Sequence, residues 1–145
     1  MSQSQQTLHE AGKYNIINNQ GSKYRVTALT IARTLTAADT GSVFMLSGAA
    51  GFAVTLPAVA TAGSGWTAKF INTVDFVYTI VSPAADIKAA YLSSTGGNGA
   101  SNVAGFATIT LAGGSVVGDS VEIICNGTNY FAMCRGDADA GITFA

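Results

Sequence analysis

Charged residues are scarce in this chain of 145 residues. Seven Lys and Arg and eight Asp and Glu make up 10% of the sequence and leave a net charge of −1. An average soluble domain has roughly 25% charged residues. The near-neutral balance argues against a nucleic-acid-binding protein, because contact with phosphate groups requires a basic surface. We therefore expect no nucleic-acid partner.

Cysteine and histidine are also rare, with two cysteines and a single histidine. Two cysteines do not make a disulfide-stabilised scaffold. Together with one histidine they cannot complete a four-ligand structural zinc site without help from carboxylates. The histidine, His9, lies in a polar N-terminal stretch, and nothing around it suggests a base for a serine or cysteine nucleophile. The carboxylates form no recognisable catalytic pair, so we expect no enzyme, no cofactor and no metal.

Long hydrophobic runs are missing as well. The longest apolar stretches, such as residues 44–46 and 76–81, are far shorter than the roughly 20 residues of a membrane-spanning helix. Residues 1–13 are polar and lack the apolar centre of a secretory signal. By contrast, 48% of all residues are hydrophobic, which argues against a disordered chain. These features predict a single folded domain, made in a cytoplasm, with no membrane partner.

The few charges are unevenly distributed. Residues 1–33 carry a net charge of +3, and residues 119–145 carry −3. Between them, residues 34–118 contain only five charged side chains. The surface of a soluble monomer usually needs many more charges. We therefore predict that much of this middle region is core or an interface with other subunits, and that the protein is an oligomer.

Several short segments are rich in β-branched and aromatic residues or alternate between apolar and polar residues. Breaks rich in glycine, asparagine or aspartate separate them, and glycine reaches 17 residues. The expected strands are residues 42–46, 52–56, 66–71, 76–81, 106–111, 116–125 and 129–134. Short, regularly spaced strands are typical of a sandwich or barrel. We predict an all-β fold, a single compact β-sandwich or barrel-like domain over residues 26–145, preceded by an irregular N-terminal arm over residues 1–25.

Residues 82–92 leave two structures open. Ser82 could cap a helix there, and Pro83 suits the first helical position. The segment is short, however, and local rules decide little over such a length. A helical turn and a non-helical connection are therefore both retained as interpretations.

The dipeptide Asn126-Gly127 lies between two β-rich runs and predicts a tight hairpin, since both residues tolerate positive φ angles. Cys125 would then lie beside the turn, and Cys134 several residues along the partner strand. At about 3.3 Å per residue the two would be roughly 15 to 20 Å apart, whereas a disulfide requires Cα atoms within about 7 Å. We therefore predict two unpaired, packed thiols.

Two segments carry a resemblance to a known family. In the first, residues 35–41, Leu-Thr-Ala-Ala-Asp-Thr-Gly, lead into an apolar run, and Ala-Val-Thr-Leu-Pro follows at residues 53–57. In the second, the Asp-Ser-Val-Glu strand that begins at Asp119 runs into Asn-Gly-Thr-Asn-Tyr at residues 126–130. Over roughly residues 34–135 the chain resembles the capsid decoration (cement) proteins of tailed bacteriophages, and it is similar to β-domains of phage fibres. The resemblance implies a β-rich virion protein, commonly trimeric, with no catalytic residues.

Residues within these segments fit such a fold. The expected members of one common core layer are Val43, Met45, Val54 and Leu56. In the hairpin, residues 121, 123 and 125 should face one way, and residues 122 and 124 the other. Tyr130 and Phe131 should lie on opposite faces.

The resemblance implies a structural protein that binds the outer surface of a phage capsid as an oligomer, with a trimer expected, and stabilises it. Its partners would be copies of itself and the major capsid protein. It would be made in the cytoplasm of the host bacterium and reside on the capsid exterior of the virion. The alternative is a fibre or receptor-binding module that recognises a host surface glycan. The aromatic residues available for that role are Tyr14, Tyr24, Trp66 and Tyr91.

The basic N-terminal arm is the candidate docking element. Such a polar segment can order against a partner as it binds. Residues that would combine positive charge for an acidic capsid with an apolar anchor are Lys13, Tyr14, Ile16, Ile17, Lys23 and Arg25. The open alternative is that residues 24–35 form the first strand and only about the first 12 residues form a tail.

Overall fold

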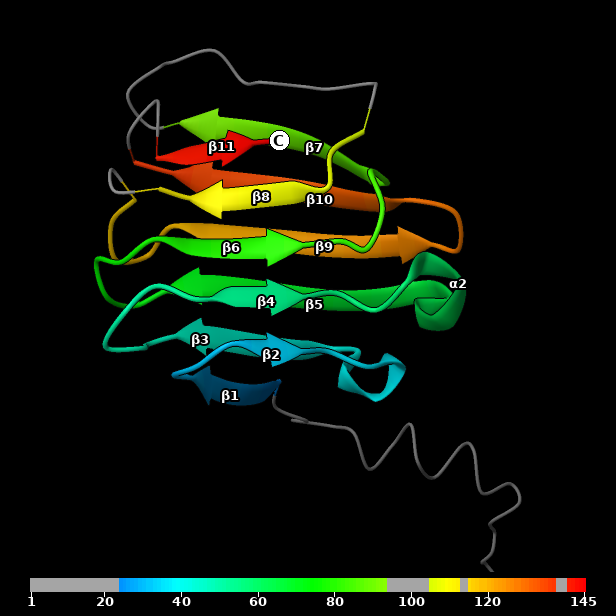
Figure 1. Cartoon of the computed structure of the whole chain (residues 1–145), viewed down its shortest axis with the longest axis horizontal. Coiled ribbons are helices and arrows are strands. Elements are labelled where there is room, and N and C mark those ends of the chain that lie inside the picture. The colour runs from blue at the N-terminus through cyan, green and yellow to red at the C-terminus, as the bar shows by residue number, and fades with distance from the viewer. Residues whose placement is uncertain (1–23, 94–104, 113–114, 138–140) are drawn as a thin grey trace, which may run out of the picture.

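The computed structural model describes residues 24–93, 105–112, 115–137 and 141–145. These residues form two mixed β-sheets, of six and five strands, packed face to face (Figure 1). The predicted all-β fold is therefore confirmed, and of the two architectures expected from the sequence it is the sandwich.

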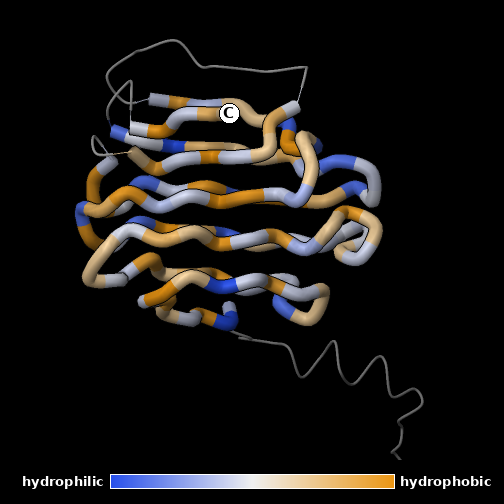
Figure 2. The backbone as a smooth tube through the Cα atoms, in the orientation of Figure 1, coloured by the Kyte–Doolittle hydropathy of each residue, from blue (hydrophilic) through white to orange (hydrophobic). Residues whose placement is uncertain are grey.

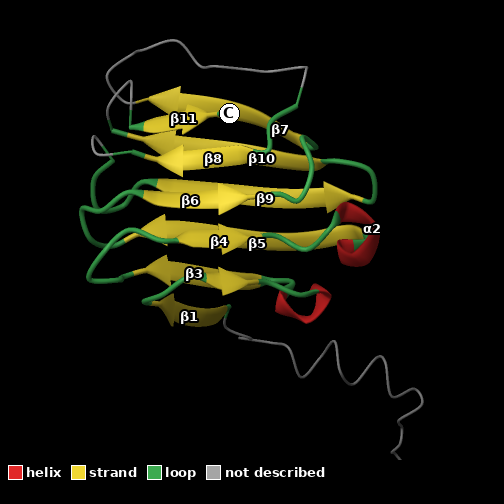
Figure 3. Cartoon of the chain, in the orientation of Figure 1, coloured by secondary structure: helices red, strands yellow, loops and turns green. Residues whose placement is uncertain are grey.

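The strands lie in the following spatial order. The six-stranded sheet contains β1 (Arg25–Leu29), β3 (Ser42–Leu46), β5 (Ser64–Asn72), β9 (Ser120–Asn126), β10 (Tyr130–Gly136) and β7 (Ile87–Ser93). The five-stranded sheet contains β11 (Ile142–Phe144), β8 (Thr108–Leu111), β6 (Tyr78–Val81), β4 (Ala53–Thr55) and β2 (Arg33–Thr34). The short helices η1 (Ala37–Asp39) and α2 (Val59–Ala62) lie at the same end of the strands (Figure 3).

The chain passes from one sheet to the other after each of its first six strands. As a result, β1, β3 and β5 are parallel neighbours in one sheet, and β2, β4 and β6 are parallel neighbours in the other. After β6 the pattern changes: β7 lies at the far edge, parallel to β10, while β8, β9 and β11 join in antiparallel pairs. Figure 1 shows the early strands along one side of the sandwich and β7, β10 and β11 along the other.

The core is the apolar layer between the two sheets. Burial alternates along the strands, as in β3, β7 and β10, and hydrophobic positions recur along both sheets (Figure 2). The largest fully buried side chains include Phe44, Phe70, Tyr78, Ile80, Ile109, Leu111 and Tyr130. Complete burial of one such side chain stabilises the fold by about 1.5–3 kcal/mol.

Two buried aromatic side chains hold the connections at the helical end of the sandwich. The Tyr130 hydroxyl donates a hydrogen bond to the Pro57 carbonyl at 2.6 Å, and the Trp66 indole donates one to the Thr36 carbonyl at 3.1 Å. The two rings meet edge to face, with 5.8 Å between their centroids. Burial raises the pKa of Tyr130, so that its hydroxyl remains a donor at neutral pH.

The helix considered for residues 82–92 is wrong. Residues 87–93 form β7, which pairs in parallel with β10 along its whole length. The Ser82 hydroxyl donates a hydrogen bond to the Asp86 carboxylate and closes a turn before the strand instead of capping a helix. Pairing with β10 over seven residues outweighs the local helix preference of a short alanine-rich segment.

The expected core layer is half correct. Val54 and Leu56 are buried, but Val43 and Met45 lie on the opposite face of β3, where they are partly exposed. Their neighbours Phe44 and Leu46 fill the core instead. The run Val-Phe-Met-Leu is apolar at every position, so its pattern does not specify which face is buried.

The predicted hairpin is confirmed, but its turn lies one residue later than predicted: Cys125 pairs with Tyr130, so Gly127 and Thr128 are the central residues of the turn. β9 and β10 pair in antiparallel fashion, and the Asn126 side-chain oxygen accepts hydrogen bonds from the N–H groups of Thr128 and Asn129. Gly127 has a φ of +90°, which glycine adopts without strain. As predicted, residues 121, 123 and 125 face the core with Tyr130, while residues 122, 124 and 131 face away from it.

Both cysteines are buried and unpaired, as predicted. In the hairpin Cys125 lies opposite Tyr130 and Cys134 lies opposite Val121. Four strand positions, about 13 Å, therefore separate them, which is shorter than expected but still beyond the reach of a disulfide. Burial raises the pKa of Cys134 from 9.0 to about 12.

We expect neither thiol of the native protein to react with a disulfide reagent at about pH 8, because both are buried and Cys134 stays protonated. After denaturation the same reagent should titrate two thiols per chain. Replacing both cysteines by alanine should lower the free energy of unfolding only modestly. An intact mass two units lower under non-reducing conditions would contradict the hairpin register.

Candidate interaction surface

The six-stranded sheet has a second face, directed away from the five-stranded sheet, which we call the outer face. Alternate side chains of all six strands form it, with Tyr24 at the β1 edge. Its members include Val26, Val43, Met45, Thr67, Lys69, Ile71, Lys88, Ala90, Glu122, Ile124, Phe131 and Met133. Leu92 and Arg135 continue the face along β7 and β10. A hollow of about 990 Å³ lies over it.

Large apolar side chains of this face are strongly exposed. The exposed fraction is 44% for Phe131, 53% for Met133, 52% for Ile124, 60% for Val26 and 78% for Tyr24. Single exposed apolar residues are normal on a protein surface. A continuous apolar patch over several strands instead marks a site of interaction.

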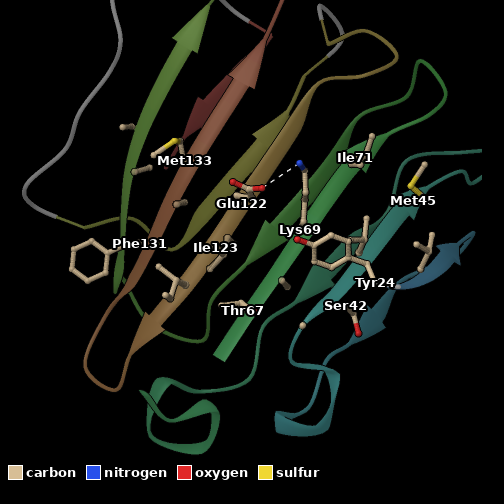
Figure 4. A pocket seen from close by; sticks show the side chains of 18 of the residues that line it. Tyr24, Ser42, Met45, Thr67, Lys69, Ile71, Glu122, Ile123, Phe131 and Met133 are labelled. Carbon is tan, nitrogen blue, oxygen red and sulfur yellow. Dashed lines mark ion pairs between the residues drawn. The ribbon is translucent and has the colours of Figure 1, made fainter. Parts of the chain in front are cut away.

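One ion pair lies at the centre of the outer face. Lys69 on β5 and Glu122 on β9 are register partners, with 3.2 Å between the Nζ and Oε2 atoms (Figure 4). Because β5 and β9 are the two central strands of the sheet, the pair lies on its midline. Figure 4 shows Met45 and Ile71 on one side of the pair, and Phe131 and Met133 on the other. An exposed pair of this kind contributes only about 0–1 kcal/mol to stability, so its main effect here is local neutrality.

The strands that form the outer face are apolar on both sides, which explains how the face arises. In β9 and β10, for example, the inward residues Ile123 and Ala132 alternate with the outward residues Ile124 and Met133. The sequence prediction located an interface in the charge-poor middle region but did not identify the outer-face residues as functional. The signal that could have identified them is the lack of polar residues at alternate strand positions.

Of the six candidate docking residues, the structure describes Arg25. The other five, Lys13, Tyr14, Ile16, Ile17 and Lys23, fall outside the described residues. Arg25, in β1, donates hydrogen bonds to the Ser42 hydroxyl and to two carbonyl groups of the η1 region, those of Ala38 and Thr40. The guanidinium of Arg25 thus ties β1 to the turn that precedes β3.

Of the three described aromatic residues considered for glycan recognition, two are buried. Trp66 is 2% exposed and Tyr91 is 4% exposed, and both belong to the core. Tyr24 is exposed at the edge of the outer face, whereas Tyr14 lies outside the described residues. Trp66 and Tyr91 therefore offer no platform on which a sugar ring could stack.

The described carboxylates mostly have structural partners. Asp39 accepts hydrogen bonds from the backbone and side chain of Thr36 and pairs with Arg33 at 2.7 Å. Asp86 accepts the Ser82 hydroxyl, a pair that closes a turn. Within residues 24–93, 105–112, 115–137 and 141–145, no group of three or more His, Cys, Asp or Glu side chains could hold a metal ion.

Asp119 is the most buried of these carboxylates, with 4% of its surface exposed. Its two oxygens accept the backbone N–H groups of Val116, at 3.0 Å, and Asp137, at 3.1 Å. The side chain therefore clamps the turn before β9 to the segment after β10. Nearby, the Asn72 amide donates to the Ser115 hydroxyl at 2.9 Å, and the Asn72 N–H donates to the Asp119 carbonyl.

We expect Asp119→Asn to lower the free energy of unfolding by about 1.5–3 kcal/mol, because one amide N–H would replace an acceptor oxygen that is bound to a backbone N–H. Urea titration measures the change. The matched control is Asp75→Asn, at an exposed loop position, which should alter stability by less than about 0.5 kcal/mol. Equal stabilities of the two variants would contradict the clamp.

Within the part of the chain that the structure describes, no helix has the length and apolar character needed to cross a membrane. The outer face is an exposed, largely apolar surface and is the candidate interaction surface of the described residues. Comparison with protein-family models, with curated proteins and with solved structures finds no match for this chain.

Proposed function

We propose that the chain is a structural protein of a virus particle, which assembles with copies of itself, as a trimer, and binds the outside of a phage capsid. Bound in this way it stabilises the capsid and has no catalytic role. The proposal includes synthesis in the cytoplasm of a host bacterium, for which two free thiols are suited.

The observation that carries this proposal is the apolar outer face of the six-stranded sheet. A protein that acts alone in solution has no use for a patch of this size, whereas a protein that functions within an assembly covers it. The polar groups of the described loops are mostly used by the fold, as Asp39, Asp119 and Arg25 illustrate. This combination favours a structural role.

Docking on the capsid is assigned to the N-terminal arm in this proposal. The arm residues Lys13 and Lys23 would meet an acidic surface, and Tyr14, Ile16 and Ile17 would supply apolar contacts. Arg25 fixes β1 to the body of the protein and so anchors the base of the arm.

The alternative, a fibre or receptor-binding module for a host glycan, has weaker support. Sugar recognition of this kind uses exposed aromatic rings, but Trp66 and Tyr91 are core residues. Among the described candidates only Tyr24 is exposed. A glycan array probed with the purified chain tests this alternative directly.

We expect the purified chain to co-sediment with phage capsids prepared without it and to saturate them at a fixed ratio of chain to capsid protein. Capsids with the protein bound should also resist heat better than bare ones. Capsids that already carry a full complement of the protein are the control, because their sites are filled. A chain that stays in the supernatant with bare capsids contradicts the proposal.

Deletion of residues 2–20 should weaken capsid binding about tenfold or more, because it removes Lys13, Tyr14, Ile16 and Ile17. The oligomer mass should be unchanged, since no described strand is altered. Lys23→Glu in the full chain should weaken binding in a salt-dependent way. Unchanged affinity and unchanged salt dependence in both variants would show that the arm is not the docking element.

A further inference from the structure

We infer that the outer face of the six-stranded sheet is the contact between copies of this chain. The inference rests on the proposed function, because it names the surface through which the proposed oligomer assembles. It concerns the chain alone, however, and the capsid does not enter it.

The size of the face suits such a contact. Six strands about 4.8 Å apart, each with five or more residues of about 3.3 Å, span roughly 24 by 20 Å, or about 500 Å² in projection. Side-chain relief and the edges raise the accessible area above this value. A standard interface buries about 800 Å² of accessible surface on each partner. Contacts between copies would therefore have to occupy most of the outer face.

The charges at the midline of the face are complementary to themselves. Lys69 and Glu122 are opposite in sign and lie together there. A symmetry axis near this midline would bring Lys69 of one copy close to Glu122 of the next, so neither of these two charges would meet its like. Each ion could then keep an opposite charge as water leaves the contact, which a buried charge requires.

The apolar residues flank this pair on both sides. Val43 and Met45 lie on the β1 side, and Phe131 and Met133 lie on the β7 side. When two copies meet about the midline, the β1 side of one face, with Val43 and Met45, can pack against the β7 side of the other face, with Phe131 and Met133. Lys88 and Arg135 belong to β7 and β10, toward one edge, where a rim residue stays in contact with water.

Two other occupants are conceivable and become outcomes of the test. Residues 1–23 lead into Tyr24 at the edge of the face, so the chain's own arm is one of them. The capsid protein is the other. Neither explains why the midline carries a balanced pair rather than charges of one sign.

The experiment measures the mass of the purified chain by light scattering after size exclusion, at about 10 to 100 μM and without capsids. The wild type should have a mass of two or more times 14.7 kDa, and three times on the stoichiometry proposed above. Ile124→Glu and Met133→Glu each place a charge in the apolar halves of the contact. Both should weaken association about a hundredfold or more and give monomers.

Matched controls introduce the same charge at exposed apolar residues outside the outer face. Val117, in the turn before β9, is 67% exposed, and Ile31, between β1 and β2, is 74% exposed. Val117→Glu and Ile31→Glu should keep the wild-type mass. Circular dichroism and a cooperative thermal transition establish that each variant is folded.

A charge exchange at the midline tests the contact without altering the apolar residues. Glu122→Lys puts two lysines in each copy at the axis, so the oligomer should dissociate at low salt and recover in part at high salt. The double variant Lys69→Glu with Glu122→Lys restores the balance and should restore the mass. This rescue keeps the test informative even where a glutamate variant in the apolar halves fails to fold.

The outcomes separate this inference from the proposed function. A wild type that is monomeric at every concentration overturns the inference, and so do Ile124→Glu and Met133→Glu variants that are folded and keep the wild-type mass. If those variants keep their mass but lose capsid binding, the face docks on the capsid: the inference fails and the proposed function stands. If the wild type is an oligomer and the folded Ile124→Glu and Met133→Glu variants are monomers, the inference is supported, even if the wild type binds no capsid. If deletion of residues 2–20 gives a monomer although the outer face is unaltered, the contact between copies belongs to the arm.

Discussion

The structure depends on apolar contact between the inner faces of its two sheets. Because β1 to β6 enter the two sheets in turn, neighbours within each sheet are separated by a strand of the other. No tight hairpin can join such parallel neighbours, so their alignment relies on the core that both sheets share. Two core residues also fix the connecting segments. The ring of each is buried, while the Tyr130 hydroxyl donates a hydrogen bond to the Pro57 carbonyl and the Trp66 indole donates one to the Thr36 carbonyl.

A sheet held in this way needs only one apolar face, yet the six-stranded sheet has two. In an isolated chain the second face is unfavourable, because it exposes apolar surface to water: Phe131, Met133 and Ile124 are each about half exposed. The same feature explains the low charge of the sequence, because outward strand positions that usually carry Lys or Glu carry Val, Met and Ile instead. The charged exceptions are Lys69 with Glu122 at the midline, which are neutral as a pair, and Lys88 and Arg135 toward the β7 edge. The low charge of the sequence, the second apolar face of the sheet and the assembly that we propose thus have one origin, the apolar residues at outward strand positions.

The sequence predicted those parts of the fold for which the signal is local. Asn126-Gly127 and the alternation around it predicted the hairpin, its facing residues and the two free thiols correctly. The sequence could not predict whether Val43 and Met45 face the core, because a strand that is apolar on both faces has the same pattern whichever face is buried. For residues 82–92 the sequence left helix and non-helix open, because the strand β7 depends on pairing with β10, about 40 residues away along the chain. The oligomer was predicted from scarce charge alone, but its proposed surface required the positions of six strands.

Several described polar residues hold turns and loops of the fold, which agrees with the assembly role that we propose. Ser82 with Asp86 could suggest a catalytic pair, but that hydrogen bond closes the turn into β7. Asp119, the most buried carboxylate, holds backbone N–H groups on two segments and has both oxygens engaged. A carboxylate occupied in this way can neither take up a substrate proton nor bind a ligand without releasing the loops it holds. The outer face holds no such loop. It combines exposed apolar side chains with the Lys69–Glu122 pair at its midline, and this combination suits the subunit contact that we propose.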